Sequence, residues 1–306
     1  MGGLKAVWMD GELVPWEQAK IHVSVNALHY GSAVFEGIRG YYHDNEVYVF
    51  RLREHVKRLV DSAKIIMLNN PFTVEQLEQA VIRTVRENGF KSNIYIRPVI
   101  YAGENLMSLN AFDLPVHAFV LVFQFEKFFS KPGLKVCVSS WRRLPDTSMP
   151  PRAKASANYL NSILASTEAK KAGYDEAILL DQSGYVSEGA GENVFLVKDG
   201  VVHTPAKSSA ILEGITRDSV ITLAGDMGYK VVERAITRTE LYTADEIFFT
   251  GTAVEILPVL EVDGRTIGDG SPGPVTKQLM EKYFRTVRGL EPQYRGWLTP
   301  VYGRGQ

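Results

Sequence analysis

One lysine lies among small residues in the segment "RAKASANYLNS" (residues 152–162), directly after a pair of prolines. A lysine is a strong nucleophile only when its amine is neutral, and burial among apolar groups disfavours the ammonium form. The alanines and serines around Lys154 would also leave room for a bulky ligand. Taken alone, the segment fits a solvated surface lysine more often than a lysine that forms a Schiff base, so other residues must decide.

A second segment, "SGYVSEGAGENVF", combines carboxylates with closely spaced glycines. Glycines allow tight backbone conformations and the close approach of another group. Glu188 and Glu192 fall in a stretch that is otherwise typical of buried strand and turn. A buried carboxylate needs a partner. The alternative interpretation is an ordinary hairpin whose acidic side chains face solvent.

Two further segments are typical of anion binding. In "EGITRD", Gly214, Ile215 and Thr216 directly precede a predicted helix, whose free N–H groups and dipole favour a phosphate. In "FFTGTAVE", the hydroxyls of Thr250 and Thr252 flank a glycine at the end of a predicted strand. Neither segment matches the nucleoside-triphosphate loop pattern. Each alone is more often a plain helix cap or turn.

The four segments together meet the needs of one cofactor. Pyridoxal 5′-phosphate requires a lysine for an imine, a carboxylate for its ring nitrogen and backbone groups for its phosphate. The conjunction of all three predicts a pyridoxal-phosphate enzyme more strongly than any single segment does.

Composition supports a small-molecule partner. The chain has 306 residues, 45% hydrophobic and 23% charged, as in a soluble globular protein. Its 34 basic and 35 acidic residues nearly cancel, so no overall field would attract nucleic acid or an anionic membrane. The single cysteine, Cys137, excludes an intrachain disulfide and a multi-cysteine metal site, and we expect no bound metal. We interpret this thiol as buried and inert.

Targeting signals are not evident in the sequence. The N-terminal "MGGLKAVWMD" lacks the apolar region of a signal peptide, and "HAFVLVFQF" is far shorter than the roughly 20 residues of a membrane helix. A cytoplasmic location is the default expectation.

Hydrophobic periodicity divides the chain into two α/β domains. We predict a small N-terminal domain over residues 1–124, a linker over 125–134, where charges, proline and glycine interrupt both periodicities, and a large cofactor-binding domain over 135–306. Helices are predicted at residues 53–68, 73–89 and 158–171, after "GITRD", and from residue 274. Hairpins are predicted at Asp10-Gly11 and Asp199-Gly200. The strand-rich hairpins argue against a doubly wound nucleotide fold.

The same motifs carry a family resemblance. "KASANYLNS", "SEGAGENVF", "GITRD" and "GTAVEI", in that order and spacing, resemble the fold-type IV pyridoxal-phosphate enzymes, and most closely the branched-chain amino acid aminotransferases. "ALHYGSAVFEGIRGY", "REHVKRL" and "YIRP" extend the similarity over nearly the whole chain. The resemblance implies the two-domain D-amino acid aminotransferase-like fold, with the cofactor between the domains.

The resemblance also implies roles for individual residues. Lys154 would form the Schiff base with the cofactor and then act as the base between substrate Cα and cofactor C4′. Glu188 would pair with the pyridine nitrogen N1, and Tyr159 would hydrogen-bond O3′. The phosphate would be held by Arg58, Ile215, Thr216 and Thr252. Without the resemblance, Arg58 would be one more charge on a basic helix face.

Residues from both domains would select the substrate. By similarity, Tyr30, Phe35, Gly37 and Tyr95 form an aromatic wall, where burial of a leucine side chain gains roughly 1.5–3 kcal/mol. The backbone N–H groups of Thr252 and Ala253 would hold the substrate α-carboxylate. Arg97 would accept the distal carboxylate of glutamate, the alternative being a buried structural arginine in a strand.

The segment "AGENLMSLNAFDLP" departs from the family pattern. It has Met107-Ser108-Leu109 where relatives commonly have a central glycine. By resemblance, this loop helps to close the pocket, partly from a neighbouring subunit. Ser108 therefore leaves relaxed or shifted specificity open. A completed site across subunits implies at least a homodimer, and a hexamer built as a trimer of dimers is equally compatible.

The resemblance predicts a transaminase that moves the amino group between L-leucine, L-isoleucine or L-valine and 2-oxoglutarate by a ping-pong mechanism, a reaction of branched-chain amino acid biosynthesis. Two enzyme alternatives stay open: a transaminase of D-amino acids or (R)-amines, and an aminodeoxychorismate-type lyase. A third alternative is a small-molecule binding protein without catalysis.

Overall fold

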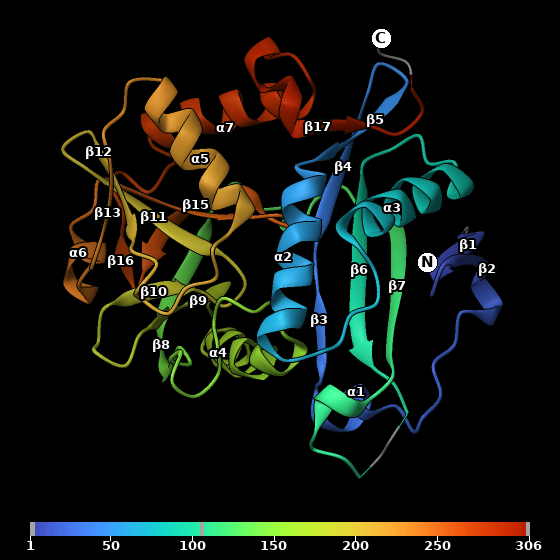
Figure 1. The fold of residues 1–306 in the computed structure, drawn as a ribbon. Helices are drawn as coiled ribbons and strands as arrows, with labels where there is room; N and C mark the ends of the chain where they lie inside the picture. Colours follow the sequence, from blue (N-terminus) through green and yellow to red (C-terminus); the bar gives the residue numbers. More distant parts are fainter. Residues whose placement is uncertain (1–3, 105–106, 304–306) are drawn as a thin grey trace. The chain divides into compact units, whose positions relative to one another are not determined.

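The computed structural model describes residues 4–104 and 107–303, which form two compact units (Figure 1). The first unit contains the described residues up to Glu126, the segment Ala153–Ala157 and residues 285–303. The second unit contains Lys127–Arg152 and Asn158–Phe284. The chain thus passes from the first unit to the second inside the predicted linker range of 125–134. Two segments of the predicted C-terminal domain, 153–157 and 285–303, belong to the first unit because they pair with its strands.

The first unit is built on an eight-stranded antiparallel sheet in the order β17-β5-β4-β6-β7-β1-β2, with β3 paired to β6. Its strands are β1 (Ala6–Met9), β2 (Glu12–Pro15), β3 (Ala33–Phe35), β4 (Ile38–His43), β5 (Glu46–Phe50), β6 (Ile94–Ala102), β7 (Val116–Gln124) and β17 (Leu298–Pro300). The predicted hairpin at Asp10-Gly11 is confirmed, and both residues have the positive φ that such a tight turn requires.

Three helices accompany this sheet: α1 (Asn26–Tyr30), α2 (Leu52–Ile65) and α3 (Val74–Asn88). Figure 1 shows α2 running alongside β3 and α3 crossing β6 and β7. Val56, Leu59 and Ala63 of α2 are fully buried in the core of the unit, as the 3.6-residue periodicity predicts. The start of α3 is confirmed as a capping box between Thr73 and Gln76. Short 3-10 turns lie at Trp16–Gln18, Ala111–Asp113 and Pro292–Trp297.

The second unit contains a nine-stranded mixed sheet in the order β10-β9-β8-β15-β14-β11-β12-β13, with β16 paired to β15. Its strands are β8 (Leu134–Arg142), β9 (Glu176–Leu180), β10 (Val186–Gly189), β11 (Asn193–Lys198), β12 (Val201–Pro205), β13 (Val231–Arg234), β14 (Glu246–Gly251), β15 (Glu255–Val262) and β16 (Arg265–Thr266). Strand β8 runs parallel to β9 and β15, and β12 runs parallel to β13. The hairpin at Asp199-Gly200 is confirmed.

The helices of the second part of the chain are α4 (Tyr159–Lys171), α5 (Ile215–Asp226), α6 (Arg238–Tyr242) and α7 (Pro274–Val287), and a 3-10 turn, Ser156–Asn158, precedes α4. The mixed α/β architecture confirms the predicted fold class. None of the helices in the described parts of the chain is both long enough and apolar enough to span a membrane.

Candidate active site

The backbone around Lys154 is fixed to the first unit. Ala155 forms an antiparallel bridge with Val34 of β3, and the N–H of Phe35 donates to the carbonyl of Lys154 at 3.1 Å. The N–H of Lys154 donates to the hydroxyl of Ser62, a fully buried residue of α2, also at 3.1 Å. The Lys154 ammonium lies 5.2 Å from the centroid of the Phe35 ring. One strand and one helix therefore determine where this lysine lies.

The small neighbours of Lys154 are buried. Ala153 and Ala155 lie in the core of the first unit, while Lys154 itself is only partly exposed. Lys154 is therefore not a fully solvated surface lysine.

Arg58 lies on the same helix as Ser62, one turn earlier, and is held by a buried carboxylate. Glu36 has no exposed surface, and its Oε1 and Oε2 accept hydrogen bonds from Arg58 Nε at 2.6 Å and Nη2 at 2.8 Å. His55 Nδ1 lies 2.7 Å from Glu36 Oε2. The fork of the guanidinium thus matches the carboxylate in a bidentate pair.

The protonation states in this cluster follow from burial and charge. Burial alone would raise the pKa of Glu36, but the Arg58 guanidinium and His55 outweigh it and hold the pKa well below its usual 4.5. Burial lowers the pKa of His55, so the neutral ring donates its Nδ1 proton to Glu36. The sequence analysis missed Glu36 and His55. The available signal was the spacing of His55 and Arg58, which places them on one helix face.

Four predicted substrate residues lie together in the first unit. Tyr95 and Arg97 point to the same face of β6, and Arg97 Nη2 donates to Tyr95 Oη at 3.2 Å. The Arg97 guanidinium carbon lies 4.5 Å from the centroid of the Phe35 ring. A Cβ atom at Gly37 would lie only 1.9 Å from Tyr95 Oη, so only glycine fits there. The group combines aromatic surface with one cationic side chain.

Tyr30, Met107 and Leu109 lie on an exposed apolar surface of the same unit. Their exposed fractions are 46%, 86% and 84%. Tyr30 lies on α1, and Met107 and Leu109 flank Ser108 in a later loop. A hydrogen bond joins these two segments, because the side-chain amide of Asn26 donates to the carbonyl of Ser108 at 2.7 Å. Exposure of this kind is typical of a surface that another protein chain covers.

Glu188, the predicted partner of the pyridine nitrogen, lies in β10 of the second unit. Its side chain is buried, and Arg143 Nη2 lies 2.7 Å from its Oε1. The other oxygen, Oε2, accepts from Asn193 Nδ2 at 2.9 Å and from the N–H of Leu212 at 3.0 Å. Glu188 and Glu192 are 4% and 7% exposed, so the alternative of a hairpin with exposed acids is wrong. The partner that a buried carboxylate needs is Arg143, which the sequence analysis missed.

The first turn of α5 offers backbone donors without a side-chain cap. Gly214 occupies the capping position, and a Cβ atom there would lie 2.0 Å from Asn193 Oδ1. Ile215 and Thr216 begin the helix and are buried. These features suit an anion that approaches the helix N-terminus closely.

The remaining predicted residues of the second unit lie at element ends. Tyr159 is the first residue of α4, and Thr252 and Ala253 form the turn between β14 and β15. Within the described residues, the nearby Thr250 hydroxyl is buried without a hydrogen-bond partner. Across residues 4–104 and 107–303, no group of three or more histidine, cysteine, aspartate and glutamate side chains is placed to hold a metal ion.

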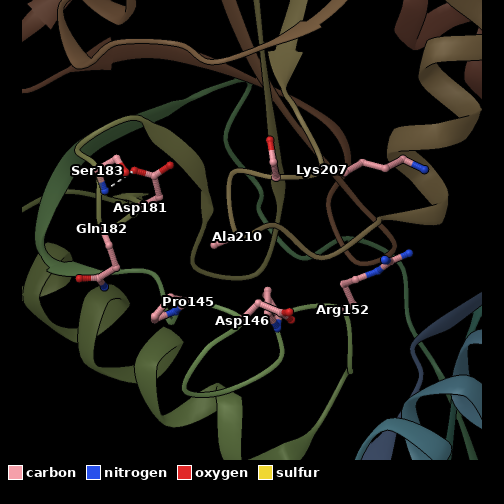
Figure 2. Close-up of a pocket in the computed structure, with 10 residues that line it drawn as sticks. Pro145, Asp146, Arg152, Asp181, Gln182, Ser183, Lys207 and Ala210 are labelled. Carbon is pink, nitrogen blue, oxygen red and sulfur yellow. Dashed lines mark hydrogen bonds between the residues drawn. The ribbon is translucent and has the colours of Figure 1, made fainter.

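A hollow of about 430 Å³ in the second unit lies between the loops at residues 145–152, 181–183 and 207–210 (Figure 2). None of the predicted cofactor or substrate residues lines it. Arg152 and Lys207 on its wall form ion pairs with Glu213 at 2.6 and 2.7 Å. The carbonyl of Ala210 on the same wall accepts from the Ser187 hydroxyl, so this wall also supports the strand that carries Glu188.

Comparison with known proteins identifies the family. The family model described as amino-transferase class IV matches residues 33–262. The "Probable branched-chain-amino-acid aminotransferase" of Aquifex aeolicus is 44% identical over 301 residues, 97% of each chain. The "Branched-chain-amino-acid aminotransferase" of Pseudomonas aeruginosa is 45% identical over 299 residues, 96% of this chain and 97% of the relative. The chain belongs to the branched-chain-amino-acid aminotransferase family.

Solved structures of this aminotransferase family share the fold. A branched-chain aminotransferase from Thermoproteus uzoniensis with norvaline has a TM-score of 0.94 and 50% identity, covering 97% of this chain and 99% of that one. The T.th. branched-chain amino acid aminotransferase complexed with N-(5′-phosphopyridoxyl)-L-glutamate has a TM-score of 0.92 and 47% identity, covering 97% of this chain and 99% of that one. The sequence-based family assignment of this aminotransferase is thereby confirmed.

Proposed function

We propose that this aminotransferase moves the amino group between L-leucine, L-isoleucine or L-valine and 2-oxoglutarate, with pyridoxal 5′-phosphate as cofactor. The observation that carries the proposal is the group formed by Phe35, Tyr95 and Arg97, in which the guanidinium lies 4.5 Å from an aromatic ring centroid. Such a group would give an aliphatic side chain apolar contact and the second carboxylate of glutamate a cation. The names of the relatives and the phosphopyridoxyl-glutamate bound to one of them support the same assignment.

The donor set fits the proposed cofactor in both units. The first unit provides a lysine with fixed backbone and a partly buried arginine for a phosphate. The second provides an uncapped helix N-terminus and a buried, ion-paired carboxylate. Bound pyridoxal phosphate would supply an electron sink for the bond changes at the substrate Cα.

In this proposal, each predicted cofactor residue has one task. Lys154 would hold the cofactor through its amine, and that amine, once displaced by the amine of the substrate, would move a proton at the substrate Cα. Glu188 would accept an N–H from the pyridine nitrogen, and Tyr159 would donate to O3′. Arg58 of the first unit and Ile215, Thr216 and Thr252 of the second would bind the phosphate, because a guanidinium and a helix N-terminus match its charge.

The substrate is oriented by its α-carboxylate at one end and by its side chain at the other. The N–H groups of Thr252 and Ala253 would bind the α-carboxylate, and Phe35 and Tyr95 would contact the side chain. Arg97 is suited to the distal carboxylate of glutamate because, in the described residues, its Nε is buried without a hydrogen-bond partner. The same residues would thereby serve both halves of a ping-pong reaction.

We further propose a homo-oligomer in which a second copy covers the exposed apolar surface of the first unit. The surface consists of Ile21, Val23, Leu28, Tyr30, Met107, Leu109 and Phe112. Its two segments are joined by the Asn26 side chain and by the N–H of Asn26, which donates to the carbonyl of Gly103 at 2.7 Å. Large apolar side chains that are exposed on joined segments are typical of an interface. A dimer and a larger ring of dimers are both consistent with it.

Gly37→Ala tests the substrate pocket. The new methyl group would overlap Tyr95 Oη, and the Tyr95 ring cannot yield easily because it packs against Phe123 and Phe125. We expect kcat/KM for L-leucine to fall by about 10- to 100-fold, which corresponds to the roughly 1–3 kcal/mol of overpacking. Steady-state kinetics measure it. The control is Gly225→Ala, because a Cβ atom at that position has no neighbour within 4 Å; an equal loss in both variants would contradict the assignment.

The proposed reaction itself is tested by half-reactions. L-leucine added to the holoenzyme is expected to abolish the visible absorption of the cofactor, and 2-oxoglutarate is expected to restore it. D-alanine and (R)-1-phenylethylamine are expected to leave the absorption unchanged. If these two compounds react and L-leucine does not, the chain is a D-amino acid or (R)-amine transaminase. Pyruvate release from aminodeoxychorismate without an amino acceptor would instead identify a lyase.

A further inference from the structure

Arg143 is a buried guanidinium that faces the carboxylate of Glu188. The two side chains are nearly inaccessible to solvent, and Nη2 lies 2.7 Å from Oε1. The opposite oxygen is occupied by two neutral donors, the Asn193 amide and the Leu212 N–H. Arg143 therefore contributes a charged donor to this carboxylate, beside these two neutral donors.

The backbone of Arg143 is anchored where β8 ends. Its N–H donates to the carbonyl of Leu180 at 2.8 Å, and its carbonyl accepts from the Gln182 side-chain amide at 3.0 Å. The pairing of β8 with β9 shifts register between Val138 and Arg142, directly before this residue. Irregular pairing of this kind redirects the side chains that follow it. The local fold thus aims the guanidinium at Glu188.

The pairing decides the charge state of Glu188. A buried carboxylate without a partner carries a desolvation cost of several kcal/mol, which is relieved when it takes up a proton or turns toward water. A guanidinium stays charged at all physiological pH values, so the pair keeps the carboxylate ionised without exposing it. A protonated Glu188 would lack the negative charge that favours a protonated pyridine nitrogen, and a displaced Glu188 would not reach the ring N–H.

We propose that Arg143 is a positioning residue for the cofactor, which acts by holding Glu188 ionised and in one orientation. The proposal rests on the proposed function, in which Glu188 accepts the pyridine N–H. Arg143 acts through Glu188, so its contribution should exist only while Glu188 carries a carboxylate.

The release of pyridoxal phosphate from the holoenzyme provides a direct measurement. The rate is followed by visible absorption after dilution into buffer without cofactor or amino acid. Arg143→Met keeps the approximate length of the side chain and removes its charge. We expect release to accelerate about tenfold, which corresponds to an activation free energy for release that is lower by about 1.4 kcal/mol. Arg143→Lys retains the charge but not the planar donor geometry, and we expect an intermediate rate.

A double-mutant cycle separates positioning from general damage to the fold. Glu188→Gln should itself accelerate release. Adding Arg143→Met to Glu188→Gln should then change the rate by less than about twofold, because the group through which arginine acts is gone. The double variant also lacks both buried charges, so it avoids the unpaired carboxylate that could prevent Arg143→Met from folding. If that single variant does not fold, Arg143→Lys takes its place in the cycle.

Two results would overturn the proposal. One is release at the unaltered rate in both Arg143 variants. The other is the same acceleration in the Glu188 and Glu188→Gln backgrounds, which would make the arginine a purely structural residue. Because release is measured without substrate, this test is independent of which amino acid the enzyme uses. The proposed function fails separately, in the half-reactions of the unaltered chain.

Discussion

Lys154→Arg is expected to lower kcat for transamination by at least about 10³-fold, within the range that a positioned general acid–base contributes. Arginine keeps the positive charge and much of the length, but its guanidinium does not lose a proton and cannot serve as a nucleophile or base. The backbone contacts to Ser62 and Phe35 do not involve the side chain, so the variant should fold. Steady-state rates with L-leucine and 2-oxoglutarate measure the effect, and circular dichroism verifies the fold.

Lys64→Arg is the matched control for this substitution. Lys64 lies near the end of α2, the helix that carries Arg58 and Ser62, but its side chain is exposed. We expect wild-type kcat and KM. Residual turnover above one tenth of the wild-type rate in Lys154→Arg would remove Lys154 from the chemistry. A non-catalytic binding protein would show no turnover in either variant or in the unaltered chain.

The parts of the fold that the sequence predicted well are those decided by neighbouring residues. Three examples each depend on contacts within a few residues: the capping box at Thr73, the helical periodicity of Val56, Leu59 and Ala63, and the hairpin at Asp199-Gly200. Such patterns are visible in the printed chain because helix and strand periodicities and turn residues are local properties.

The missed features depend on pairs that are distant in sequence. Glu36, which directly follows β3, contacts Arg58 of α2, which lies 22 residues later in the chain. Arg143 contacts Glu188 because β8, β9 and β10 are neighbouring strands of one sheet. Strand β17 joins β5 from the far end of the chain, which no local pattern indicates. The resemblance named the residues expected to touch the cofactor. It did not name the buried charges that hold them, because those partners do not stand out by type or spacing.

Glu36→Gln is expected to lower the free energy of unfolding by about 3–5 kcal/mol at pH 7.5, the effect of breaking a buried ion pair by removing one partner. The amide has one acceptor oxygen, so it cannot accept from both arms of Arg58 and from His55, and its NH₂ group would face a donor. Urea unfolding followed by fluorescence measures the loss. Glu75→Gln is the control, because its ion pair with Arg53 is exposed on α3, and we expect no measurable change.

The pH dependence of this loss follows from the pKa of Glu36. Burial alone would raise the pKa of Glu36, but Arg58 and His55 together outweigh burial, so the folded pKa is well below the usual 4.5 and the stabilisation begins to be lost as the pH falls through about 4.5. Below that pH the unfolded carboxyl takes up a proton and the folded one does not. The difference between wild type and Glu36→Gln should therefore narrow by about 1 kcal/mol between pH 4.5 and 3.5, and the slope should approach about 1.4 kcal/mol per pH unit at lower pH. A constant difference across this range would mean that the Arg58 and His55 contacts do not hold Glu36 ionised.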